Sequence, residues 1–147
     1  GKPAKWMFNS TFKDCKGLTK IPDGLFSGIS DAPAEGMFNN TFWGCTGLTK
    51  IPDGLFSEIS GKPATWMFHG TFCNCTGLTE IPDDLFSGIS GPAAEDMFSG
   101  TFDDCRSLTG TITPNFFGNI TPQITQEYLN SEYTFRGVNI TYQTTNN

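Results

Sequence analysis

The stretch from residue 37 to residue 60 is written nearly four times along this chain, always at the same spacing. Each copy begins at a methionine: Met7, Met37, Met67 or Met97. Neighbouring copies are therefore 30 residues apart, and a fixed period of about 20–50 residues is typical of proteins whose repeats stack on one another. A single copy cannot bury its own apolar side chains, so the copies must share one core. The repeat predicts a solenoid.

Each copy is predicted to fold as a helix, a short strand and a short helical turn. Residues 33–45 of the second copy open with a proline, which is favoured at the first position of a helix. The apolar side chains that follow recur at helical spacing, at Phe38, Phe42 and Cys45. Residues 48–51 are long enough only for a short strand, and Pro-Asp-Gly at 52–54 is a turn sequence. Strands stack about 4.8 Å apart and helices about 10 Å apart, so the stack is expected to curve with its strands inside.

The sequence from Phe42 to Pro52 resembles the BspA-like leucine-rich repeats of bacterial surface proteins, whose motif runs approximately F-x-x-C-x-x-L-x-x-I followed by proline. The resemblance covers residues 1–120, although the period is longer than in common members and the recurrent Met-Phe and Leu-Phe-Ser-x-Ile-Ser blocks mark a subclass. It implies an α/β solenoid, a leucine-rich-repeat-like right-handed horseshoe of four helix–short strand–helical turn repeats plus a C-terminal cap. It also implies adhesion or protein binding outside the cell, and no catalytic residue.

Two regions are expected on this basis. Residues 1–120 would hold the four tandem 30-residue leucine-rich-like repeats, and residues 121–147 would form a C-terminal capping helix and strand. Terminal repeats that depart from the pattern are commonly caps. Residues 138–142 alternate between apolar and polar side chains, which is typical of a strand.

The composition excludes some classes of partner. The net charge is −6 and the chain has nine Lys and Arg, whereas binding to nucleic-acid phosphates needs a basic surface. No run approaches the roughly 18 apolar residues of a membrane-spanning helix, so no membrane insertion is expected. The chain begins at Gly1, which suggests a mature or excised form. An acidic surface rich in Thr and Asn favours an extracellular or cell-surface location.

Four of the five cysteines share one position of the repeat: Cys15, Cys45, Cys75 and Cys105. A disulfide needs Cα atoms within about 7 Å, whereas equivalent helix positions would stand about 10 Å apart, so buried free thiols are favoured over disulfides. A metal ladder is disfavoured because His69 is the one histidine. Other copies place Lys, Trp or Asp where Cys73 stands, so Cys73 is predicted to be an exposed thiol.

No cofactor, metal or catalytic site is expected. Asp23, Asp53 and Asp83 lie in register, but single carboxylates lack the ligand density of a calcium site, and helix capping is the favoured role. No copy shows a Ser/His/Asp catalytic set, a phosphate-binding glycine loop or a pair of catalytic carboxylates. The chain is therefore predicted not to be an enzyme.

The leading hypothesis is a non-catalytic extracellular or cell-surface repeat protein that mediates protein binding or adhesion. The three tryptophans stand where other copies have Gly, Asp, Lys or Cys, and exposed tryptophan is enriched at binding hot spots. The candidate interaction surface consists of Trp6, Trp43, Trp66, Lys20, Lys50 and Glu80. An ice-binding ladder of one threonine per copy is a weaker third hypothesis.

The alternative is a structural building block that self-assembles head to tail into filaments. Residues 1–30 carry five Lys and two Asp, a net charge of +3, whereas residues 91–120 carry one Arg and four acidic residues, a net charge of −3. The chain also starts in phase with a repeat boundary, which leaves the first copy uncovered. The candidate assembly face consists of Lys2, Lys5, Phe8, Phe12, Lys13 and Lys16. The expected partner is another protein or a second copy of this chain in a head-to-tail homo-oligomer.

Overall fold

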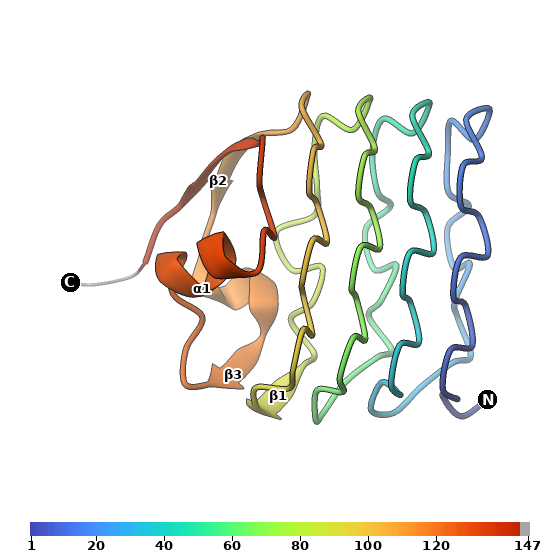
Figure 1. Ribbon diagram of the computed structural model, residues 1–147. Coiled ribbons are helices and arrows are strands. Elements are labelled where there is room, and N and C mark those ends of the chain that lie inside the picture. Colours follow the sequence, from blue (N-terminus) through green and yellow to red (C-terminus); the bar gives the residue numbers. More distant parts are fainter. Residues whose placement is uncertain (145–147) are drawn as a thin grey trace.

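The computed structural model describes residues 1–144, in which short elements join long runs of turns (Figure 1). This part of the chain has one α-helix, α1 (Gln126–Ser131), and one 3-10 helix, η1 (Pro114–Phe117). Its strands form two parallel two-stranded sheets. In the first sheet β1 (Ser90–Pro92) pairs with β3 (Asn119–Thr121), and in the second β2 (Thr109–Ile112) pairs with β4 (Asn139–Tyr142).

The expected α/β solenoid, a leucine-rich-repeat-like right-handed horseshoe with a helix in every copy, is wrong. Residues 33–45 contain no helix, and turns and irregular segments make up most of the described chain. Where residues 48–51 were predicted to form a strand, the structure has a single bridge between Lys50 and Glu80. The division into residues 1–120 and 121–147 stays a prediction, and residues 145–147 lie outside the described residues.

Equivalent phenylalanines of neighbouring copies lie too close together for a helix in each copy. Phe42 stacks between Phe12 and Phe72, and its ring centroid is 5.3 Å from each of theirs. Packed helices need about 8–10 Å between their axes, whereas strand-like segments stand about 4.8 Å apart. Centroid distances of 5.3–5.9 Å recur in three columns of rings, which contain Phe8, Phe38, Phe68 and Phe98; Phe12, Phe42, Phe72 and Phe102; and Phe26, Phe56, Phe86 and Phe116.

Backbone hydrogen bonds alternate between the chain itself and the next copy. The N–H of Thr41 donates to the C=O of Phe38, three residues earlier. The N–H of the following residue, Phe42, instead donates to the C=O of Thr71 in the third copy, at 2.8 Å. An α-helix would direct both bonds to residues four positions earlier in the same segment. Each copy is therefore a run of turns joined edge to edge with its neighbour.

A left-handed backbone recurs at every fourth residue of these turns. In the second copy the φ angles are +58° at Gly36, +52° at Asn40 and +73° at Gly44. Glycine and asparagine adopt positive φ at the lowest cost, and a right-handed helix excludes it. This spacing of four also places Phe38 and Phe42 on one side, which explains why the same sequence fits a helical pattern.

The Thr-Phe-x-x-Cys sequence recurs because its polar atoms bond the preceding copy inside the core. The fully buried Thr71 donates its hydroxyl to the C=O of Phe38 at 2.9 Å. Cys75, also fully buried, donates its thiol to the C=O of Phe42 at 3.2 Å. Buried polar groups are costly unless they are hydrogen-bonded, so these two side chains link neighbouring copies.

Candidate functional site

A partial fifth copy lies at the C-terminal end of the stacked segments. Phe135 stacks on Phe102 with ring centroids 5.3 Å apart and an interplanar angle of 4°. The buried Thr134 donates its hydroxyl to a carbonyl of the fourth copy, as the threonines of earlier copies do. Gly137 has a φ of +75°, the left-handed conformation that the last turn of each copy requires. The fifth copy therefore continues the pattern beyond residue 120.

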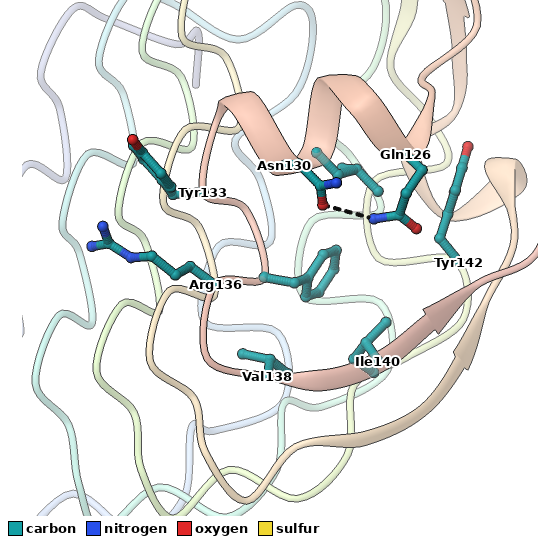
Figure 2. A pocket seen from close by; sticks show the side chains of 9 residues that line it. Gln126, Asn130, Tyr133, Arg136, Val138, Ile140 and Tyr142 are labelled. Carbon is teal, nitrogen blue, oxygen red and sulfur yellow. Dashed lines mark hydrogen bonds between the residues drawn. The ribbon is translucent and has the colours of Figure 1, made fainter.

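A hollow of about 340 Å³ opens on the outer side of this fifth copy, between α1 and the segment that leads into β4 (Figure 2). Its walls are largely apolar and include Leu129, Phe135, Val138 and Ile140. Leu129 is buried, whereas the other three side chains are only half-buried. These four residues define the C-terminal hollow together with the polar and aromatic residues around them: Gln126, Asn130, Tyr133, Arg136 and Tyr142.

Interactions within the chain hold the rim of the C-terminal hollow in place. Gln126 donates its side-chain amide to the side-chain oxygen of Asn130 at 3.0 Å, across one turn of α1 (Figure 2). The Tyr142 hydroxyl donates to the C=O of Ile124 at 2.7 Å. Thr125 begins α1 by accepting a hydrogen bond from the N–H of Tyr128 at 3.1 Å, which satisfies one donor of the first turn. The hollow is therefore formed before any partner binds.

Two backbone N–H groups beside the hollow have no acceptor among the described residues. In the fourth copy the N–H of Phe102 donates to the C=O of Thr134, and the N–H of Asp104 donates to the C=O of Arg136. Phe135 and Gly137 occupy the corresponding positions of the fifth copy, and their N–H groups donate to no acceptor within residues 1–144. Unpaired donors along an edge are a ready site for another segment of polypeptide. The hollow can thus take an apolar side chain and two backbone carbonyls together.

On the other side of α1, two buried oxygen atoms lack partners. The Tyr128 hydroxyl and one carboxylate oxygen of Glu132 make no hydrogen bond within the described residues. Burial raises the pKa of Glu132 above its ordinary value, and the neighbouring Asp96 and Glu95 carboxylates raise it further. Burial likewise raises the pKa of Tyr128. Ionised Glu132 is therefore unfavourable for the fold.

Glu132→Gln is expected to stabilise the protein at neutral pH. Because the folded-state pKa of Glu132 lies above the unfolded value, protonation contributes stability below the ordinary pKa of about 4.3, and this contribution is lost as the pH rises through the folded-state value. The amide mimics the protonated acid at every pH. Melting temperatures of both proteins should therefore converge below the ordinary pKa of about 4.3 and diverge as the pH rises above it. Glu127→Gln on the exposed side of α1 is the charge-matched control, and a less stable E132Q at pH 7 would contradict the expectation.

The opposite end of the molecule presents the candidate assembly face (Figure 1). Phe8 and Phe12 are half-buried here, although their counterparts in the second, third and fourth copies are fully buried. The C=O groups of Thr11 and Lys13 accept no hydrogen bond within residues 1–144. Two lysines of this face contact the second copy: Lys5 pairs with Glu35 at 2.7 Å, and Lys13 lies over the Trp43 ring at 4.9 Å. Lys2 and Lys16 are exposed.

The six residues of the candidate interaction surface do not form one site. Trp6 and Trp66 contact each other with ring centroids 5.8 Å apart, and Trp66 donates its indole N–H to Asp96 at 2.9 Å. Trp43 instead lies under Lys13. Lys20, Lys50 and Glu80 line a separate polar groove of about 410 Å³. The tryptophans therefore have partners within the chain, and the charged residues belong to another surface.

The cysteines are free, but their exposure differs from the expectation at two positions. Cys45, Cys75 and Cys105 are buried, as predicted, and burial raises the pKa of Cys45 to about 11 and that of Cys105 to about 12. Cys15, in the uncovered first copy, is exposed. Cys73 is only half-buried, and burial with the nearby Asp103 carboxylate raises its pKa to about 11. The exposed thiol is therefore Cys15 rather than Cys73.

Comparison of the chain with protein-family models, with curated proteins and with solved structures found no match. The resemblance to BspA-like repeats stays a prediction, and neither the comparisons nor the structure supports the expected surface position or adhesion. Within residues 1–144, no helix is long and apolar enough to cross a membrane. No group of three or more His, Cys, Asp or Glu side chains in that range could hold a metal ion.

Proposed function

We propose that this chain is a non-catalytic protein-binding module and that the C-terminal hollow is its binding site. One observation carries the proposal: an apolar hollow lies beside the N–H groups of Phe135 and Gly137, which donate to no acceptor within the described part of the chain. Two backbone donors at alternate residues match alternate carbonyls of another polypeptide segment, and the hollow can take one of its side chains. The absence of catalysis, the lack of a cofactor and the extracellular location stay predictions.

The tryptophans are a weaker choice for the binding site. A Cβ atom at Gly36 would collide with the ring of Trp6, so Trp6 and Trp66 cover the backbone of the second copy. Trp6 is an exposed side chain, at 39%, but it contacts Trp66, and Trp66 and Trp43 are half-buried. Their arrangement supports a packing role, whereas the hollow has apolar walls and backbone donors with no partner in the described chain.

Selection from a phage-displayed library of random peptides tests the proposal. The wild-type protein is expected to enrich peptides with an aromatic or large aliphatic anchor, because such side chains fill apolar hollows. Ile140→Glu places a carboxylate in the hollow and should abolish binding of the enriched peptides, whereas Lys50→Glu in the separate polar groove should leave it unchanged. Thermal unfolding checks that both variants are folded. Failure to enrich any peptide, or equal binding to I140E, would refute the proposed site.

A further inference from the structure

We propose that the partner of the C-terminal hollow is a second molecule of this chain, whose Phe12 enters the hollow and stacks on Phe135. This inference rests on the proposed function of the hollow and adds the identity of its occupant. Phe12 already stacks on Phe42 with one face, at 5.3 Å, and remains half-buried rather than buried. Phe135 likewise stacks on Phe102 with one face and borders the hollow with the rest of its side chain. The contact would continue the ring column from one molecule into the next.

The unpaired backbone groups of the two ends match in type and in register. Within the chain, the fourth copy donates from Phe102 and Asp104 to the C=O groups of Thr134 and Arg136. The fifth copy offers the N–H groups of Phe135 and Gly137 at the same two positions. In the repeat, Thr11 and Lys13 of the first copy are the counterparts of Thr134 and Arg136, and their C=O groups accept no hydrogen bond within residues 1–144. In a head-to-tail pair, the two N–H donors of one molecule would therefore meet the two C=O acceptors of the next.

Charge complementarity also favours a second copy over an unrelated partner. Residues 1–30 have a net charge of +3, whereas residues 91–144 carry two Arg and six acidic residues, a net charge of −4. Opposite charges on two surfaces guide association and fix its orientation. Exposed charges are screened within about 8 Å at physiological ionic strength, so the contact should weaken as salt is added.

The contact would cover the one exposed cysteine. Cys45, the counterpart of Cys15 in the second copy, donates its thiol to the C=O of Phe12 at 3.1 Å. In the docked pair Cys15 of the incoming molecule takes the same position relative to Phe135, which removes the thiol from solvent. Its reactivity therefore reports the contact independently of molecular mass.

A head-to-tail contact of this kind leaves one free end on each molecule, so oligomers can grow. Sedimentation velocity of wild-type protein is expected to show species that increase with protein concentration and decrease with salt. Labelling of Cys15 by a thiol reagent should slow over the same concentration range. A wild-type protein that remains monomeric at high concentration and low salt, with unchanged Cys15 labelling, would overturn the proposal.

Two variants test the two contact surfaces separately. Phe12→Glu alters only the first copy and Ile140→Glu alters only the hollow, so each alone should lose oligomers beyond background. An equimolar mixture should form a one-to-one dimer and nothing larger, because the intact hollow of F12E receives the intact first copy of I140E. Oligomers that persist in either variant, or a mixture that stays monomeric while wild-type protein assembles, would also overturn the proposal. If library peptides bind the hollow but wild-type protein does not associate, protein binding stands and the second copy is excluded as the partner.

Discussion

Replacement of Phe42 by alanine is expected to destabilise the protein by about 3–5 kcal/mol. The Phe42 side chain is fully buried and stacks between Phe12 and Phe72, 5.3 Å from each. Each of these rings is fixed by its own copy, so they cannot move together to fill the cavity that the truncation leaves. Urea unfolding measured by circular dichroism should show a lower midpoint with little change in slope.

Phe12→Ala is the matched control because Phe12 holds the same position in the first copy. Phe12 is half-buried and has only Phe42 as a ring neighbour within its column, so its truncation removes less buried surface and leaves an opening rather than a cavity. The loss should be clearly smaller than for F42A. Equal losses at both positions, or no change for F42A, would mean that the column is not packed as described. The comparison should be made at low protein concentration, where self-association cannot contribute.

The alignment of equivalent residues could be predicted from the repeat, but the backbone conformation could not be derived from the apolar pattern. Phe38 and Phe42 are four residues apart, a spacing that serves one face of a helix and one side of a run of turns equally well. The signal that distinguishes the two is Asn40 and Gly44, which stand four residues apart and both have positive φ. The first copy hides this signal because Trp6 and Ser10 occupy two of the left-handed positions.

Only part of the candidate site could be predicted from the sequence. Thr134, Phe135 and Gly137 repeat the Thr-Phe-x-Gly of the second copy, so the fifth copy could have been found by extending the repeat past residue 120. The walls of the hollow depend on tertiary packing instead. β4 reaches its position by pairing with β2, and Tyr142 is held by the carbonyl of Ile124, contacts that no local pattern indicates.

The exposure of the cysteines illustrates the same limit. Variability between copies indicated that Cys73 faces solvent, but the copies stand close together and Trp43 of the preceding copy lies beside it in the same surface hollow. Cys15 shares the repeat position of three buried cysteines and is nevertheless exposed, because it lies in the outermost of the described copies. A residue's position in the repeat therefore does not determine its burial; its neighbours in the stack do.

Gly118→Ala is expected to destabilise the protein by about 2–6 kcal/mol, because the substitution adds both backbone strain and a steric collision. Gly118 has φ +75° and ψ −150°, a region that only glycine adopts without strain of about 1–3 kcal/mol. Its Cβ atom would also collide with the carbonyl oxygen of Ile89 and stand 2.9 Å from that of Phe86, and forced overpacking typically costs about 1–3 kcal/mol. Both oxygen atoms belong to the backbone, so neither can move away by a change of side-chain rotamer.

Gly28→Ala separates these two costs, because Gly28 has a φ of +83° but no atom lies within 4 Å of its added Cβ. Only conformational strain should appear at this position, so G28A is expected to lose less stability in urea unfolding than G118A, which also carries the collision. The collision should also reach the C-terminal hollow: Gly118 follows Phe117, whose ring lies 6.4 Å from that of Phe135 and 6.1 Å from that of Tyr142. G118A should therefore lose peptide binding and self-association at temperatures where it is still folded, whereas G28A should retain peptide binding. Equal losses of stability in G28A and G118A would mean that β3 does not approach β1 as closely as the structure places it.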